Sequence, residues 1–236
     1  MLQIVVLSPH LDDAVFSLGA AIAGATARGA VVTVLTVLAG DPESAAPAGP
    51  WDAAAGFHTA GEAARTRRLE DTRACGEIGA QPVWLGYADE QYERGGSDEE
   101  ILARVLRETC AGDAVLVPGF PLGHADHRWL AELVRAHLEP RLVAEYVEQP
   151  YAALWTPGPA DERAWHAIAS SPADHAAKVR ACRAYATQLP LFEAEIVSAI
   201  ASYEAEHGGE TIAWRDGSWT GSLFPIGREG LNIERS

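Results

Sequence analysis

Short apolar segments alternate with longer, partly polar segments along the first 150 residues of the chain. The apolar segments have the length and β-branched content of buried strands, and they fall at residues 3–8, 30–40, the start of 81–92, 114–120 and 141–150. The segments between them show helical spacing or helix start signals, and they predict helices over residues 14–29, 61–80, 97–110 and 128–138. Strands that alternate with helices in this way are typical of parallel crossover units.

The alternation weakens after residue 150, where two helical stretches at 171–187 and 191–208 precede a loop-like tail. Residues 41–59 are rich in Pro, Gly and Ala without a steady period, and they predict a long loop. We therefore predict one α/β domain over residues 1–236, a Rossmann-like, mostly parallel sheet with helices on both faces and a C-terminal helical addition. Within it, residues 150–236 are the expected substrate-specificity region.

Composition and charge narrow the classes of partner. The chain has 236 residues, of which 48% are hydrophobic, and a net charge of −15, so it has enough apolar residues for a core and lacks the positive charge that nucleic-acid binding needs. Three separated cysteines without a CxxC pair predict a reducing compartment. The start MLQIVVLSPHLDD lacks a basic segment, and aspartates interrupt its apolar run. We expect a cytoplasmic protein without a membrane span, and a homo-oligomer remains open.

Two loops at predicted strand ends carry side chains that commonly bind metal ions. PHLDD follows the first strand and GHADH follows the fourth, and the candidate ligands in them are His10, Asp12, Asp13, His124, Asp126 and His127. Because parallel strands point the same way, both loops should lie at one edge of the sheet. Three nitrogen or oxygen ligands with a fourth position open are typical of catalytic zinc. The spacing alone leaves open which three residues ligate.

Each of these residues also has an ordinary structural explanation. Asp12 or Asp13 alone would suit the N-cap or first turn of the following helix, and Asp126 would suit the N-cap of the next one. His124 and His127 would then be solvent-facing loop residues. The two loops taken together favour a metal site.

PHLDDAV and GHADH, in this order, resemble the paired motifs of the PIG-L/LmbE-like de-N-acetylases, zinc-dependent amidases that act on N-acetylglucosaminyl compounds. The resemblance implies that His10, Asp13 and His127 ligate zinc, with ferrous iron as the alternative ion. It also implies that Asp12 is the general base and His124 the acid or oxyanion stabiliser. Asp126 is a candidate for orienting a ligand histidine, because ligating imidazoles commonly donate their other N–H to a carboxylate.

Three further segments resemble the family. RRLED, with Arg67, and LGYADEQY, with Asp89, resemble segments whose arginine and aspartate contact sugar hydroxyls, and KVRACRAYATQ resembles the family's C-terminal helix. The alternative for Arg67 and its neighbour is surface charge paired with the acids three and four residues along the chain. One position departs from the pattern: Leu122 stands where some members have a mobile tyrosine that polarises the amide.

The sequence thus predicts a zinc-dependent hydrolase that removes the N-acetyl group from an N-acetylglucosaminyl small-molecule glycoconjugate, within specialised metabolism. An amidase for a thiol conjugate or for a longer N-acyl sugar is the alternative within the same fold. A non-catalytic metal- or sugar-binding module is the alternative from another class. The expected partner is a small N-acyl amino sugar.

Overall fold

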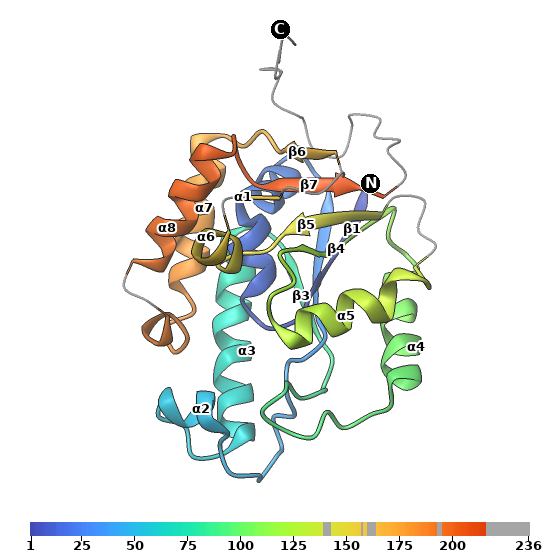
Figure 1. Ribbon diagram of the computed structural model, residues 1–236, viewed down its shortest axis with the longest axis vertical. Coiled ribbons are helices and arrows are strands. Elements are labelled where there is room, and N and C mark those ends of the chain that lie inside the picture. Colours follow the sequence, from blue (N-terminus) through green and yellow to red (C-terminus); the bar gives the residue numbers. More distant parts are fainter. Residues whose placement is uncertain (139–142, 157, 160–163, 193–194, 216–236) are drawn as a thin grey trace, which may run out of the picture.

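Seven strands form one sheet in the order β3-β2-β1-β4-β5-β7-β6 (Figure 1). The structure is a computed structural model, which describes residues 1–138, 143–156, 158–159, 164–192 and 195–215. The strands are β1 (Gln3–Ser8), β2 (Val31–Thr36), β3 (Gln81–Trp84), β4 (Ala114–Phe120), β5 (Val143–Val147), β6 (Trp165–Ala167) and β7 (Thr211–Trp214). The pairs among β1 to β5 are parallel, and β7 runs antiparallel to both β5 and β6. The predicted α/β class with a mostly parallel sheet is confirmed.

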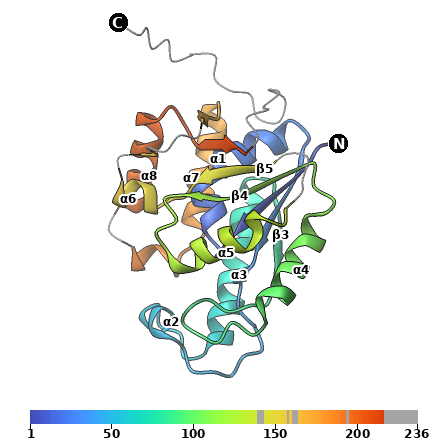
Figure 2. The same ribbon diagram turned by 45° about the vertical axis from the view of Figure 1, so that its right-hand side comes forward.

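Helices cover both faces of this sheet, as predicted. They are α1 (Asp13–Ala27), α2 (Pro50–Ala54), α3 (Ala60–Glu77), α4 (Asp98–Thr109), α5 (Ala125–Arg135), α6 (Tyr151–Trp155), α7 (Pro172–Arg183) and α8 (Ile196–Glu206), with a short 3₁₀ turn at Leu189–Leu191. Helices α1, α3, α7 and α8 lie on one side of the sheet and α4 and α5 on the other, and this separation persists when the view is turned (Figure 2).

The core is divided by the sheet because successive strand residues point to opposite faces. On β1, Ile4 and Val6 pack with α1, α3 and α7, whereas Val5 and Leu7 pack with α4 and α5. Strands buried on both faces explain why the sequence shows continuous apolar runs instead of strict alternation.

The order in which the chain adds strands to the sheet changes side between β1 and β4. The chain builds β2 and β3 outward on one side of β1, and then places β4 and β5 on the other side. In open α/β sheets, such a switch point leaves a crevice at the carboxyl ends of the two central strands, which is where ligands bind.

Two predicted loops contain regular structure, which corrects the sequence analysis. The segment 41–59 includes the short helix α2, and a bridge between Pro47 and Thr59 closes the segment on itself. The segment read as a loop-like tail supplies β7, which joins β5 to β6. The C-terminal addition therefore extends the sheet as well as adding helices. In the described part of the chain, no helix is both long and apolar enough to cross a membrane.

Candidate active site

The two His/Asp loops meet at the switch point. His10 and Asp13 come from the turn between β1 and α1, and His127 comes from the first turn of α5, directly after β4. Their side chains converge although 114 or more residues separate them in the sequence, because β1 and β4 are adjacent and parallel. The expectation that both loops share one edge of the sheet therefore holds in the structure.

Three atoms of this cluster form a nearly equilateral triangle. His10 Nδ1 lies 3.2 Å from Asp13 Oδ2 and 3.2 Å from His127 Nε2, and His127 Nε2 lies 3.1 Å from Asp13 Oδ2. A tetrahedral zinc ion with bonds of about 2.0–2.1 Å separates its ligands by about 3.3 Å. The three atoms thus have the chemistry and the spacing of a zinc site with one open position.

Two further groupings could also hold an ion. His124 has a ring nitrogen within 4.8 Å of ligand atoms of both His10 and His127, and His124 also groups with Glu90 and Asp126. The second grouping is more exposed, and Asp126 already binds other partners. The triangle of His10, Asp13 and His127 has the shortest distances between its ligand atoms.

A buried carboxylate fixes the ring orientation of each histidine in the triangle. His127 Nδ1 lies 2.5 Å from Glu148 Oε1, and His10 Nε2 lies 3.1 Å from Asp126 Oδ2. When these nitrogens carry the protons, His127 Nε2 and His10 Nδ1 both present lone pairs to the centre of the triangle. Asp126 is in turn held by Arg94, 2.7 Å away.

Glu148 was missed by the sequence analysis, although it is fully buried. Its second carboxylate oxygen accepts the backbone N–H of Leu122 at 2.9 Å, so it ties the loop after β4 to the end of β5. The signal was present in the sequence, because Glu148 lies near the end of the predicted strand 141–150, and the ends of the parallel strands meet at the same edge as the two motifs.

The electrostatics of the cluster favour a positive charge at its centre. Burial lowers the pKa of His127, but the carboxylates of Asp13 and Glu148 outweigh it and raise the pKa to about 9. Burial likewise opposes ionisation of Asp13, yet the adjacent His127 and His10 hold the pKa of that carboxyl well below its usual range. These carboxylates would stabilise a cation at the centre of the triangle.

Asp12 and His124 lie beside the triangle. Asp12 is buried, and burial together with the negative charge of Asp13 raises the pKa of its carboxyl to about 7. Although Asp12 occupies the N-cap position of α1, its side chain makes no capping hydrogen bond, so the capping alternative does not explain it. His124 Nδ1 accepts the backbone N–H of Asp126, and its Nε2 lies 3.5 Å from Glu90 Oε1.

The interpretation of Asp126 as an ordinary N-cap is wrong. Helix α5 begins at Ala125, and His124 is its N-cap. Asp126 lies in the first turn of the helix, where its carboxylate binds His10, Arg94 and the backbone N–H of Glu90.

A cavity of about 370 Å³, here called the site cavity, opens beside the cluster. Its polar lining includes His10, Asp12, Arg67, Asp89, Glu90, Gln91, His124 and Gln188. Its apolar lining includes Trp51, Tyr151, Leu154, Trp155 and Phe192. Trp155 is 57% exposed and packs against Gly123, where a Cβ would lie 2.4 Å from the indole ring. The glycine of GHADH thus makes room for an aromatic residue at the cavity rim.

Arg67 and Asp89 both line the site cavity, as the proposed sugar contacts require. Arg67 is buried and its Nη1 lies 2.5 Å from Asp52 in α2, so the interpretation as a surface charge paired along its own helix is wrong. Its Nε and Nη2 have no hydrogen-bond partner among the described residues. The Asp89 carboxylate accepts both the backbone and the side-chain N–H of Gln91.

Leu122 has a backbone role in this structure. Its φ is +55°, its N–H donates to Glu148, and its carbonyl accepts from Arg128 Nη1 at 2.8 Å. The tyrosine that lies at the cluster is instead Tyr151, at the start of α6, whose ring centroid is 4.9 Å from that of His127. Burial raises the pKa of the Tyr151 phenol well above its usual range, so the hydroxyl stays protonated.

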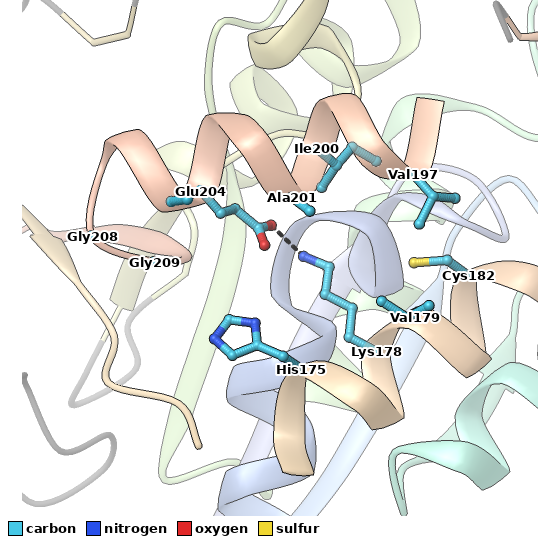
Figure 3. Close-up of a pocket in the computed structure, with 11 residues that line it drawn as sticks. His175, Lys178, Val179, Cys182, Val197, Ile200, Ala201, Glu204, Gly208 and Gly209 are labelled. Carbon is cyan, nitrogen blue, oxygen red and sulfur yellow. Dashed lines mark hydrogen bonds and ion pairs between the residues drawn. The ribbon is translucent and has the colours of Figure 1, made fainter. Parts of the chain in front are cut away.

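A second cavity, of about 460 Å³, lies between α7 and α8 and shares no lining residue with the site cavity (Figure 3). Lys178 extends across it and donates to Glu204, and it also lies 2.6 Å from Glu210. Glu210 accepts the backbone N–H groups of Ala20 and Ala21, just after a kink in α1. The charged groups of this cavity are thus engaged with the protein itself.

An α/β sheet with a His/Asp triangle and a buried carboxylate at its switch point has the arrangement that a metal-binding site requires. The family model of PIG-L, described as GlcNAc-PI de-N-acetylase, matches residues 5–138, which is more than half of the chain. The protein belongs to this family, and the family resemblance seen in the sequence is confirmed.

Solved structures share the fold over nearly the whole chain. A deacetylase of the teicoplanin biosynthetic pathway is 22% identical, with a TM-score of 0.75 over 91% of this chain and 98% of its own. The A40926 pseudoaglycone deacetylase is 25% identical, with a TM-score of 0.70 over 96% and 98%. The N,N'-diacetylchitobiose deacetylase from Pyrococcus horikoshii is 20% identical, with a TM-score of 0.58 over 90% and 82%. No curated protein sequence matches the chain significantly.

Proposed function

We propose that this protein is a metal-dependent de-N-acetylase that hydrolyses the acetamide of an N-acetylglucosaminyl unit in a small-molecule glycoconjugate of specialised metabolism. One observation carries the proposal: three electron-pair donors face one point, and a buried carboxylate with a pKa near neutrality lies beside them. Membership of a de-N-acetylase family supports the same chemistry.

His10, Asp13 and His127 hold the ion in this proposal, with zinc as the expected metal and ferrous iron as the alternative. The ion supplies a Lewis acid that lowers the pKa of water to roughly 7. Glu148 and Asp126 keep the two ligand imidazoles in the tautomers that leave a nitrogen free for the ion.

Asp12 is the proposed general base. A catalytic base works best when its pKa is near the operating pH, because it must both accept and release a proton. Burial and the negative charge of Asp13 raise the pKa of the Asp12 carboxyl. In this proposal, Asp12 takes a proton from the attacking water and delivers it to the departing amine.

His124 and Tyr151 are the proposed donors to the oxygen of the attacked carbonyl. His124 accepts a backbone N–H at Nδ1, so its Nε2 carries the proton that it donates into the site cavity. Tyr151 lines the same cavity, and its ring lies beside that of His127. A well-placed donor at the developing negative charge is worth about 3–4 kcal/mol in other enzymes.

The lining of the site cavity supports an amino sugar with an apolar aglycone. The lining combines polar side chains, among them Arg67 and Asp89, with the aromatic side chains of Trp51 and Trp155. Aromatic side chains pack well against sugar faces and apolar groups. Residues 150–236 supply Trp155, Gln188 and Phe192 to this lining, in keeping with the predicted substrate-specificity region.

The test is release of acetate and free amine from a panel of N-acetylglucosaminides. The panel carries methyl, phenyl and longer aryl aglycones, and matched N-butanoyl and N-octanoyl sugars test the acyl chain. We expect acetate release that a chelator abolishes and that added zinc or ferrous iron restores. Binding of the sugars without any hydrolysis, with every metal supplied, would identify a binding module instead.

A further inference from the structure

We infer that Gln188 is a substrate-binding residue whose side-chain amide donates to a neutral hydroxyl oxygen of the bound sugar, and this inference rests on the proposed function. Gln188 follows α7 and lines the site cavity together with Asp12 and Arg67. It is 5% exposed, and its Nε2 has no hydrogen-bond partner in the part of the chain that the structure describes. A buried donor without a partner is costly, so its retention points to a partner that the substrate supplies.

Comparison with the other glutamine of the site cavity sharpens this point. Gln91 also lines it, but its Nε2 donates to Asp89 and its Oε1 accepts the backbone N–H groups of Trp51 and Asp52. The amide of Gln91 is therefore engaged in holding α2 against the loop after β3. Of the two glutamine amides, that of Gln188 is the one whose N–H groups remain available.

Helix α3 holds Gln188 beside Arg67. Glu70 follows Arg67 by one turn, and its carboxylate accepts the backbone N–H of Thr187 at 2.8 Å and the Thr187 hydroxyl at 2.8 Å. Asp71, the next residue, accepts the hydroxyl of Tyr185 at 2.8 Å. Residues three and four positions apart share a helix face, so the RRLED segment presents Arg67 to the cavity and also fixes the residues around Gln188.

Gln188 and Arg67 together form what we call the hydroxyl subsite of the site cavity. The charges around it favour a neutral hydrogen-bond acceptor over an anion. Arg67 also has two N–H groups without a partner, but its charge is already balanced by Asp52 at 2.5 Å. Asp12 and Glu90 add negative charge to the cavity lining. A phosphate or carboxylate would meet this negative potential, whereas a sugar hydroxyl accepts the same hydrogen bonds without charge repulsion.

The experiment measures kcat/KM for N-acetylglucosaminide and for its 3-deoxy, 4-deoxy and 6-deoxy analogues. Gln188→Leu keeps the size of the side chain and removes the donor, and Gln188→Glu keeps its shape and replaces the donor with an acceptor. We expect both variants to lose about 10–100-fold on the parent sugar. On the one analogue that lacks the accepted hydroxyl, Gln188→Leu should lose less than threefold relative to the wild-type protein.

Two further variants separate binding from folding. Thr187→Val removes one contact to Glu70, so it should lose about 3–10-fold on the parent sugar, with the same dependence on the analogue. Gln81→Leu makes the same chemical change at an exposed strand residue outside the cavity and should change kcat/KM less than twofold. Thermal unfolding midpoints report whether each variant is folded.

The outcomes distinguish this inference from the proposed function. Equal losses for Gln188→Leu on all four sugars, or a loss below threefold on the parent, would overturn the role of Gln188 while leaving the hydrolase intact. If the wild-type protein hydrolyses none of the sugars, the proposed function fails. The fluorescence of Trp51 and Trp155 then reports sugar binding directly: weaker binding of N-acetylglucosamine by Gln188→Leu supports the subsite, and equal or no binding overturns it.

Discussion

Two clusters of buried charge differ in how their groups are matched. Between α7 and α8, Lys178 contacts Glu204 and Glu210, and Glu210 also accepts backbone N–H groups of α1. At the ends of β1 and β4, two nitrogens and one oxygen of the triangle face one another, and the carboxylates of Glu148 and Asp126 bind the other ring nitrogen of each histidine. Buried charge whose partners are all in the protein stabilises a packing arrangement, whereas three electron-pair donors that face one point have the geometry of the metal site that we propose.

The same contrast appears inside the site cavity. The side-chain amide of Gln91 donates to Asp89. By contrast, Nε2 of Gln188 and two N–H groups of Arg67 have no hydrogen-bond partner among the described residues. Since burying an unmatched polar group costs about 1–3 kcal/mol, we propose that substrate hydroxyls form hydrogen bonds with these groups of the site cavity.

The largest expected effect is on catalysis at the triangle of His10, Asp13 and His127. Asp12→Asn removes the base while keeping the shape of the side chain, so kcat should fall by about 10²–10⁴-fold. Thermal stability should not fall, because the substitution removes a buried charge. Steady-state amine release and thermal unfolding of the same preparation measure both quantities. Turnover within tenfold of the wild-type value would assign the base to another residue.

The second prediction concerns the cluster of Lys178, Glu204 and Glu210, whose charges are paired within the protein. Lys178→Met leaves Glu204 and Glu210 buried without their cation, so the free energy of unfolding should fall by about 3–5 kcal/mol. Denaturant titration measures this loss, and the remaining folded protein should keep its metal content and kcat. Adding Glu204→Gln should restore part of the stability. A large loss of kcat per folded molecule would show that the two clusters are coupled.

The third prediction concerns Glu148, which binds the ring of the proposed ligand His127. Its replacement should lower the affinity of the triangle for metal without abolishing binding. Glu148→Gln replaces the carboxylate that orients His127, and we expect metal affinity to fall by about 10–100-fold. Competition with a chromophoric chelator measures the dissociation constant, and Glu145, the other buried glutamate of this strand segment, offers Glu145→Gln as a control. Unchanged affinity in Glu148→Gln would mean that its hydrogen bond holds the loop and does not tune the ligand.

The smallest effect is a pH dependence of stability. Burial and the charge of Glu210 raise the pKa of Glu204 to about 7, more than Lys178 lowers it. Because the folded state binds this proton more tightly than the unfolded state, stability rises as pH falls from about 8 to about 5. Glu204→Gln should match the wild-type protein near pH 5 and exceed its unfolding free energy by about 1–3 kcal/mol at pH 8.5. Parallel stability curves for the two proteins would disprove the raised pKa.

The sequence predicted the sheet and the meeting of the two motifs because both follow from short-range pattern and one topological rule. Apolar runs identify the strands, and parallel strands bring PHLDD and GHADH to one edge. The sequence pattern did not predict helix α2. This helix has only five residues, and the contact of Asp52 with Arg67 holds it in place. The alternative interpretation of Arg67 as a surface charge is also wrong, because Arg67, Glu70 and Asp71 are buried and have partners distant in sequence.

Some features of the site lie beyond sequence patterns altogether. Which carboxylate orients which histidine depends on side-chain geometry, as the pairs of His10 with Asp126 and His127 with Glu148 show. The free amide of Gln188 is visible only when every partner in the fold has been counted. Spacing alone offered six candidate ligands, and the side-chain distances support the set of three that the family resemblance implies.

The central claim is that adjacent aspartates have different roles: Asp13 holds the ion and Asp12 moves the proton. The most direct test is the number of zinc or ferrous ions bound per chain, measured by equilibrium dialysis and elemental analysis, for Asp12→Asn and Asp13→Asn beside the wild-type protein. The account predicts one ion per chain for the wild-type protein and for Asp12→Asn, and a large loss of bound ion for Asp13→Asn. Full occupancy in Asp13→Asn, or loss of the ion in Asp12→Asn, would contradict it.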